Sequence, residues 1–156
     1  MRLARLDHEF FEKAPRSQLG ALLLETGLLS HEDLDRALEE KVPGELLGEA
    51  LVRLGFCFEE DIARALAKQA GIEWVDIEVT SLDRAAVKLL TQEQAEALHA
   101  MPVRFHTTGE VSVAVADPTD ETLLPKLKLA TGQPVRLLVA TPSALRAAQA
   151  KIYAGY

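Results

Sequence analysis

The chain has 156 residues, of which 48% are hydrophobic and 26% charged, and its formal net charge at pH 7 is −7. This hydrophobic content can form a sizeable core and excludes an intrinsically disordered chain, and the length suits one domain or two small ones. The acidic balance argues against a protein that binds long nucleic acid, because such binding depends on neutralising many phosphates.

The sequence also lacks the usual signs of membrane insertion, secretion and metal binding. No run approaches the roughly 18 consecutive apolar residues that a membrane-spanning helix needs, and charges interrupt residues 1–13, where a signal peptide would be apolar. The single cysteine, Cys57, excludes an internal disulfide framework and a CxxC metal site, and the four histidines show no HxxxH or HExxH spacing. We therefore expect a cytoplasmic protein with no metal site and no cofactor.

After an N-terminal arm, 1–14, the chain contains an internal repeat. Residues 18–41 (QLGALLLETGLLSHEDLDRALEEK) and 46–69 (LLGEALVRLGFCFEEDIARALAKQ) match when they are offset by 28 positions. The matched pairs are Leu19 with Leu47, Gly20 with Gly48, Leu23 with Leu51, Gly27 with Gly55, Leu34 with Ile62, and Leu38 with Leu66. Spaced matches in a single register indicate two copies of one structural unit.

Each copy predicts a helix, a turn and a second helix. In the first copy, the apolar residues of 19–24 predict a short helix that ends at Gly27, where a positive φ is tolerated. Ser30 is expected to cap the next helix, whose spacing buries Leu34 and Leu38 on one face.

The second copy follows the same plan with one change at its turn. Phe58 occupies the position of the capping serine, so the acidic residues 59–61 must favour the start of the second helix through the helix dipole instead. Residues 42–45 (VPGE) form the joint between the copies.

The pattern changes after residue 71. Residues 72–77 alternate like a short edge segment, 83–90 and 91–100 predict helices, and 101–106 and 111–116 predict the strands of a hairpin. A helix over 120–131, a strand over 135–140 and a final helix over 143–153 follow, with Gly132 as a breaker and Thr141 as a cap. The predicted class is α+β, with a helical subdomain of two tandem helix-turn-helix repeats (15–70) packed on a small α/β subdomain (71–156).

The doubled motif resembles RLGxxLxxxGxxxxxxLxxxLxxQ, the tandem motif of MshEN-type N-terminal domains on type II secretion and type IV pilus-assembly ATPases, including pilus motors of the PilB/PilF type. The second half is similar to the same family through GIEWVDIEVTSLD, MPVRF, VSVAVADPTD and PVRLLVATPSALRAAQAKIY. The resemblance covers about residues 16–155. It implies a bacterial domain whose ATPase core lies elsewhere in a longer chain.

The resemblance also implies a ligand. Members with both motifs intact are implied to bind cyclic di-GMP through the motif arginine and glutamine, the backbone of the Leu-Gly pair and an aspartate in an Ala-Asp-Pro turn. Carried over residue by residue and extended to the apolar positions that could line a groove, the expected ligand-binding residues are Arg16, Gln18, Leu19, Gly20, Leu23, Leu28, Leu29, Leu38, Lys41, Leu46, Leu47, Gly48, Glu49, Leu51, Gln69 and Asp117.

Three of these positions depart from the family motif. The motif arginine is Gln18 in the first copy and Leu46 in the second, and the closing glutamine of the first copy is Lys41. Both arginines that could stack on guanine are therefore replaced, and the spacer between the copies has four residues where the family usually has five. Either the ligand is held differently, or this chain has lost it.

Several candidate residues also have an ordinary structural interpretation. Gly20 and Gly48 could admit a phosphate to the backbone, or they could allow two helices to pack closely. Asp117 could accept the N1–H and N2–H of guanine, or it could shape the turn before Pro118. Arg16 could meet a guanine edge or a phosphate, or it could be a solvated surface charge.

No Walker A motif, GxGxxG, GxSxG or Ser/His/Asp arrangement occurs, so an enzyme is not expected. The first hypothesis is a regulatory domain that binds cyclic di-GMP across the two repeats and the Asp117 turn, and so favours one arrangement of the two halves. The alternative is a protein-docking module that recruits the ATPase to an inner-membrane assembly platform, with a degenerate repeat that binds no nucleotide.

Overall fold

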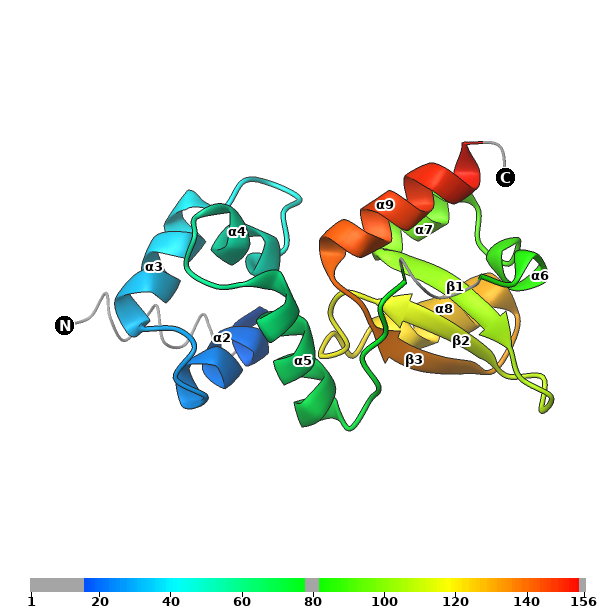
Figure 1. Cartoon of the computed structure of the whole chain (residues 1–156), viewed down its shortest axis with the longest axis horizontal. Helices are drawn as coiled ribbons and strands as arrows, with labels where there is room; N and C mark the ends of the chain where they lie inside the picture. The colour runs from blue at the N-terminus through cyan, green and yellow to red at the C-terminus, as the bar shows by residue number, and fades with distance from the viewer. Residues whose placement is uncertain (1–15, 78–81, 155–156) are drawn as a thin grey trace. The chain divides into compact units, whose positions relative to one another are not determined.

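The computed structural model describes residues 16–77 and 82–154, and the side chains of residues 16–18 lie outside the described part (Figure 1). The predicted N-terminal arm, 1–14, also lies outside it. The chain divides into two compact units between Leu66 and Ala67, within one helix. Among the described residues, the first unit contains helices and the second contains helices and a small sheet, which confirms the predicted α+β class.

The first unit contains the two predicted helix-turn-helix copies. The first copy consists of α2 (Arg16–Glu25) and α3 (His31–Glu40), and the second consists of α4 (Leu47–Arg53) and α5 (Glu59–Ala70), the last turn of which belongs to the second unit (Figure 1). The alternation of helices and turns predicted from the repeat is confirmed.

The predicted helix ends are also confirmed. Gly27 and Gly55 follow the first helix of each copy with φ of +76° and +80°, a conformation that costs glycine little. Ser30 caps α3 by accepting a hydrogen bond from the backbone N–H of Asp33 at 3.2 Å. Phe58, at the equivalent position of the second copy, is 79% exposed, and the first turn of α5 carries three acidic residues.

Repeated leucines form the core of the first unit. Those of α2 and α4 that match in register are almost fully buried: Leu19, Leu23, Leu47 and Leu51. Leu34 and Ile62 are buried on the second helix of each copy. The prediction that Leu38 is buried is wrong, because this side chain is only partly covered, whereas its partner Leu66 is 2% exposed.

The second unit is built on a three-stranded sheet in the order β1-β2-β3. β1 (Ala100–Phe105) and β2 (Val111–Val115) form the predicted antiparallel hairpin, and β3 (Val135–Val139) runs parallel to β2. The expected edge segment at 72–77 contributes one parallel bridge, Trp74 to Val139, in which the N–H of Val75 donates to the carbonyl of Val139 at 2.8 Å.

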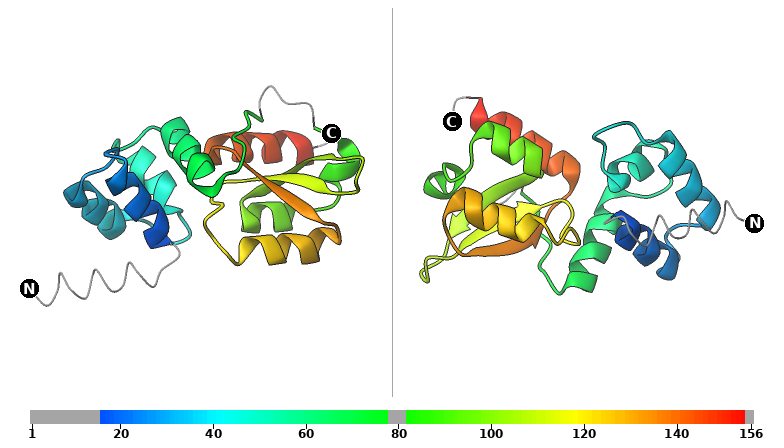
Figure 2. Two further views of the ribbon diagram at one scale, coloured as in Figure 1. Left: turned by 90° about the horizontal axis from the view of Figure 1, so that it is seen from below. Right: turned by 180° about the vertical axis from the view of Figure 1, so that it is seen from behind.

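Helices cover both faces of this sheet. α8 (Leu123–Thr131) lies against one face and α9 (Pro142–Tyr153) against the other (Figure 2). All five residues of β2 are buried as a result. Thr141 caps α9 as predicted, accepting from the N–H of Ala144 at 3.3 Å.

Three predicted helices are shorter than their sequence patterns indicate. α6 covers only Arg84–Val87, because the N–H groups of Leu89 and Leu90 bond to carbonyls three residues back instead of four. α7 (Gln92–Leu98) ends at His99, which adopts a left-handed φ of +49°. α8 begins at Leu123 instead of 120, because the carboxylate of Asp120 binds the N–H of Thr122 at 3.0 Å and holds a turn there.

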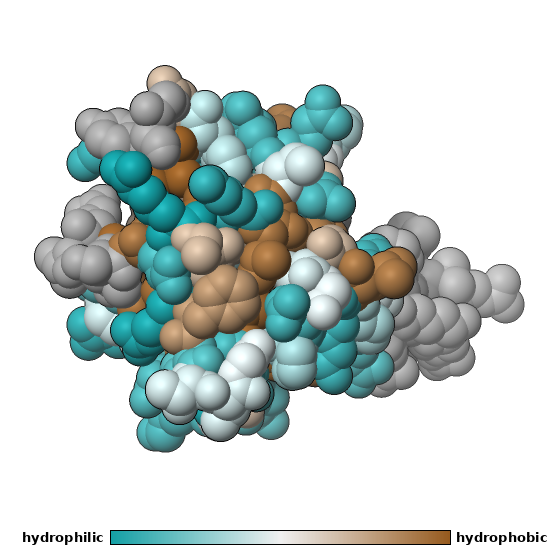
Figure 3. Space-filling model, turned by 90° about the vertical axis from the view of Figure 1, so that its right-hand side faces the viewer, coloured by the Kyte–Doolittle hydropathy of each residue, from teal (hydrophilic) through white to brown (hydrophobic). Residues whose placement is uncertain are grey.

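Within residues 16–77 and 82–154, no helix has the length and apolar character needed to cross a bilayer. The same described residues contain no cluster of three or more His, Cys, Asp or Glu side chains that could hold a metal ion. Apolar side chains are not confined to the interior, because brown apolar surface lies among hydrophilic residues on the face shown in Figure 3.

Candidate functional site

The two Leu-Gly pairs lie beside each other in the first unit. Leu19 and Gly20 belong to α2, Leu47 and Gly48 begin α4, and all four residues are buried. A Cβ placed on Gly48 would lie 3.7 Å from the Cδ2 atom of Leu19, so the first residue of one motif borders the space beside the second residue of the other. The fold therefore groups the most specific part of the doubled motif.

Each motif glycine also packs against the second helix of its own copy. A Cβ on Gly20 would lie 3.1 Å from the Cδ2 atom of Leu34, and one on Gly48 would lie 3.7 Å from the Cγ2 atom of Ile62. Leu34 and Ile62 are equivalent residues of the two copies. Close helix packing therefore accounts for Gly20, whereas a Cβ at Gly48 would meet only ordinary van der Waals contacts.

The turns of the two copies meet as well. The thiol of Cys57 donates to the carbonyl of Leu28 with a sulfur–oxygen distance of 3.7 Å, and the guanidinium of Arg36 lies 5.7 Å from the centre of the Phe56 ring. Leu29 is buried while Leu28 is 39% exposed. Burial raises the pKa of the Cys57 thiol, so the sulfur stays protonated near neutral pH.

The joint between the copies engages two of the predicted ligand residues. The Nζ atom of Lys41 donates to the carbonyl of Glu45 at 3.0 Å, and a carboxylate oxygen of Glu49 accepts the backbone N–H of Leu46 at 3.1 Å. Lys41 and Glu49 therefore help to shape the start of α4. Leu46, which replaces the motif arginine, precedes α4 and is partly covered.

An ion pair that the sequence analysis did not identify completes this joint. Arg53 donates to the two carboxylate oxygens of Glu45 at 2.9 and 3.1 Å and to the carbonyl of Glu40 at 3.0 Å. The hydrogen bond from Arg53 lowers the pKa of Glu45. Opposite charges eight positions apart were the only signal in the sequence, and that spacing corresponds to no regular helix pair.

The remaining polar candidates lie outside the first unit or outside the described side chains. Asp117, in the second unit, accepts the N–H of Thr119 at 2.9 Å and also its hydroxyl group. Gln69 is exposed near the end of α5. The side chains of Arg16 and Gln18 lie outside the description. The predicted residues from 19 to 51 all belong to the first unit, and it stays a prediction that they and the other four form one ligand site.

The helical repeats and the small sheet covered by helices define a two-unit α+β domain. The family model of the MshEN domain matches residues 70–155, which is more than half of the chain, and the chain therefore belongs to the MshEN domain family. The resemblance seen in the sequence is confirmed. No curated protein matches the chain.

Solved structures support this assignment over nearly the whole length. The structure of MshE with cdg (cyclic di-GMP) is 28% identical, with 86% of this chain and 98% of that chain covered and a TM-score of 0.68. A structure of the N-terminal domain of XpsE is 28% identical, with a TM-score of 0.72. The alignment covers 88% of this chain and 94% of the XpsE chain. Both alignments are long enough to include the helical repeats as well as the sheet.

Proposed function

We propose that this chain is a cytoplasmic, non-enzymatic domain that binds cyclic di-GMP and regulates a type IV pilus or type II secretion ATPase in the same longer protein. The observation that carries the proposal is the similarity to MshE, solved with cyclic di-GMP, over 86% of this chain. The doubled Leu-Gly motif, in which Leu19 borders the space beside Gly48, supports it.

The helical unit offers suitable surface for such a ligand. Leu28 is 39% exposed, and Leu38 and Leu46 are partly covered, so apolar surface is available for the face of a purine. A ligand that binds one arrangement of the domain more tightly shifts the equilibrium toward that arrangement. This differential affinity is the proposed route from the second messenger to the motor.

Calorimetry on the 156-residue chain tests the proposal directly. We expect heat of binding and a raised melting temperature with cyclic di-GMP, because a ligand that binds only the folded state stabilises it by mass action. ATP, GTP and linear pGpG serve as comparison ligands and are expected to bind more weakly. If a large excess of cyclic di-GMP produces neither heat nor a thermal shift, the proposed binding function is wrong.

Restoring a motif arginine gives a sharper test. Leu46→Arg places a guanidinium where the family motif has one, and a cation–π contact to guanine is expected to tighten binding by about threefold to thirtyfold. Val42→Arg is the matched control, since Val42 is exposed in the same joint and outside the predicted site. Equal effects of the two substitutions would mean that only the added charge matters.

A second matched pair tests Asp117. Asp117→Asn keeps a side chain that can form the same turn but removes the charge, and it is expected to weaken binding by about tenfold to a hundredfold. Asp120→Asn is the control, because Asp120 makes the same contacts with Thr122, at 3.0 Å to the N–H and 2.7 Å to the hydroxyl. If Asp117→Asn binds as well as the parent chain, this aspartate only forms a turn.

The alternative function is a protein-docking module for an inner-membrane assembly platform. The observation that favours it is the engagement of the polar candidates within the fold: Lys41 binds a carbonyl of the joint and Asp117 binds Thr119. A chain that gives no signal with cyclic di-GMP, and whose binding to a platform protein is unchanged by Leu46→Arg, would support docking over nucleotide sensing.

A further inference from the structure

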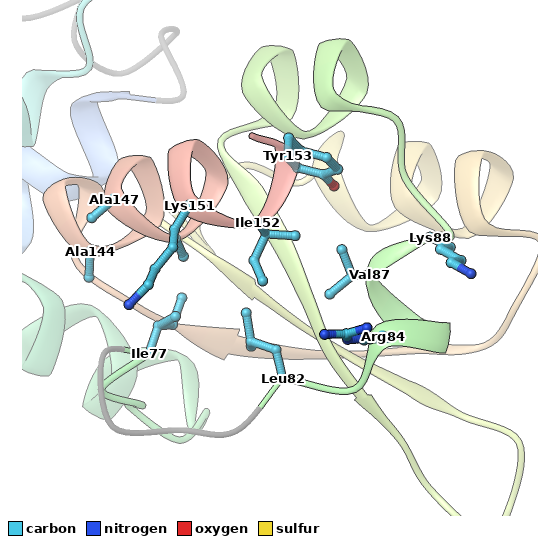
Figure 4. A pocket seen from close by; sticks show the side chains of 11 residues that line it. Ile77, Leu82, Arg84, Val87, Lys88, Ala144, Ala147, Lys151, Ile152 and Tyr153 are labelled. Carbon is cyan, nitrogen blue, oxygen red and sulfur yellow. The ribbon is translucent and has the colours of Figure 1, made fainter. Parts of the chain in front are cut away.

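The second unit contains a pocket of about 830 Å³ between α6 and α9, and no residue of the predicted nucleotide site lines it (Figure 4). Its lining combines apolar side chains with three cations and a tyrosine: Ile77, Leu82, Arg84, Val87, Lys88, Ala144, Ala147, Ala148, Lys151, Ile152 and Tyr153. These residues come from three separate stretches of sequence, so only the tertiary structure brings them together.

The pocket has an apolar floor and is kept open by small residues. Ile77 and Val87 are buried, and Leu82 and Ile152 are partly covered. The face that α9 turns toward the pocket carries alanines at 144, 147 and 148, whose short side chains leave space that larger ones would fill. An apolar chain could therefore lie along α9 without displacing a side chain.

Hydrogen bonds fix α9 in its position beside the pocket. The amide of Gln149 donates to the carbonyls of Ala95 and Ala100, both at 3.0 Å, and the hydroxyl of Tyr153 donates to the carbonyl of Leu90 at 3.0 Å. Gln149 is only 6% exposed, so these bonds are shielded from water. The pocket is therefore formed in advance of any ligand.

Charge at the rim of the pocket is one-sided. Arg84, Lys88 and Lys151 line it, and no carboxylate is among the described residues that do so. Elsewhere in the described chain, Arg36, Arg53 and Arg136 form ion pairs. The three cations that line the pocket have no acidic partner within the described residues. A positive cluster of this kind in a chain of net charge −7 favours a negatively charged ligand.

The side-chain directions give the pocket two cationic ends with apolar walls between them. In Figure 4 the Lys151 side chain from α9 points toward Ile77 at one end of the pocket, and the Arg84 side chain from α6 lies at the other end, with Leu82 and Ile152 between them. A bare inorganic anion would leave the apolar walls uncovered. An uncharged apolar ligand would reduce the hydration of the cations without pairing them.

We infer that this pocket binds an amphiphilic anion, with its alkyl chain against Leu82, Val87 and Ile152 and its carboxylate or phosphate group at the end formed by Arg84 or the end formed by Lys151. Two sources supply this chemistry, a free fatty acid and an anionic phospholipid. The inference is independent of the cyclic di-GMP proposal, because no residue is shared between the two predicted sites.

Titration of the isotope-labelled 156-residue chain with decanoate, below its critical micelle concentration, tests the inference by nuclear magnetic resonance. We expect saturable shifts of amide signals in α6 and α9. Decyltrimethylammonium, which has the same chain and the opposite charge, and inorganic phosphate are expected to produce no saturable shift there. Equal binding of the ammonium compound, shifts spread over the whole chain, or no saturation with decanoate would each overturn the inference.

Matched double variants locate the charged group. Arg84→Gln with Lys151→Gln is expected to weaken decanoate binding by about tenfold, since the head group loses its charged donors. Lys126→Gln with Lys128→Gln removes the same charge from the exposed surface of α8 and is expected to leave affinity unchanged. Equal losses in both double variants would contradict a local site.

Two further measurements separate the possible sources and sites. A phospholipid is the source if the chain co-sediments with phosphatidylglycerol vesicles but not with phosphatidylcholine vesicles, and if the Arg84/Lys151 double variant loses this co-sedimentation. Decanoate binding without co-sedimentation identifies a free fatty acid. Displacement of decanoate by cyclic di-GMP would overturn the inference of a separate site, whereas a chain that binds decanoate but no cyclic di-GMP would contradict only the proposed function.

Discussion

The two copies of the repeat share their packing positions but differ at their helix starts and at the positions implied to bind the ligand. Leu23 and Leu51, matched in register, are both fully buried. Ser30 caps α3, whereas the equivalent Phe58 is 79% exposed and provides no cap. The two copies thus share the apolar spacing that buries the helix pair, while different residues favour the start of the second helix: a serine cap in the first copy and acidic residues in the second.

The two motif glycines also differ between the copies, in the space around them. The space around Gly20 is tight, with Leu34 at 3.1 Å from an added Cβ, whereas Gly48 has ordinary contacts at 3.7 Å. The first copy therefore needs its glycine for packing more than the second copy does. Any ligand contact that both glycines make would be separate from this difference in packing.

The largest expected effect tests whether the two copies contribute equally to the core. Leu23→Ala and Leu51→Ala each remove a fully buried side chain and leave a cavity, so each is expected to lower the free energy of unfolding by about 2–5 kcal/mol. Urea unfolding followed by far-UV circular dichroism measures both. A loss below about 1 kcal/mol in one variant alone would break the equivalence of the copies.

Exchange of the capping residues is expected to have a smaller effect of opposite sign in the two copies. Ser30→Ala removes the acceptor of the Asp33 N–H and is expected to cost about 1 kcal/mol, while Phe58→Ser adds a cap to α5 and is expected to gain up to about 1 kcal/mol. Ser30→Thr, which keeps the hydroxyl, is the control. Stabilisation by Ser30→Ala would contradict the assigned cap.

Alanine at the motif glycines is expected to separate the copies further. Gly48→Ala should stabilise the chain by about 0.5–1 kcal/mol, because alanine favours a helix and meets only ordinary contacts there. Gly20→Ala should gain less or lose stability, since Leu34 must move. Cyclic di-GMP affinities of the same variants separate the packing role from the ligand role, because weaker binding by a stabilised Gly48→Ala chain requires contact with the ligand.

The smallest expected effect concerns the joint between the copies. The pKa of Glu45 is lowered in the folded state by its hydrogen bond from Arg53, so the stability it contributes is present above its unfolded pKa of about 4.3 and is lost as pH falls through the lower folded value. The difference in unfolding free energy between the parent chain and Glu45→Gln should therefore be constant from about pH 7 to 5 and shrink below about pH 4. A difference that grows on acidification would contradict the ion pair.

The sequence by itself determined the features that depend on neighbouring residues. The glycines after α2 and α4, the caps at Ser30 and Thr141, and the hairpin around Gly109 act over a few positions and are visible in the residue pattern. The doubled Leu-Gly motif likewise predicted two copies of one helix-turn-helix unit, because spaced matches in a single register indicate a structural repeat. The turn at Asp117 follows from the same local chemistry, since an aspartate binds the N–H two residues ahead.

Only the tertiary structure decided the features that depend on contacts between distant segments. Leu38 and Leu66 occupy equivalent positions, but Leu66 is 2% exposed whereas Leu38 is only partly covered. The parallel pairing of β2 with β3 and the pocket between α6 and α9 join residues far apart in the chain. Burial, ion pairing and pocket shape are properties of such contacts, and periodicity along one segment contains no information about the segment packed against it.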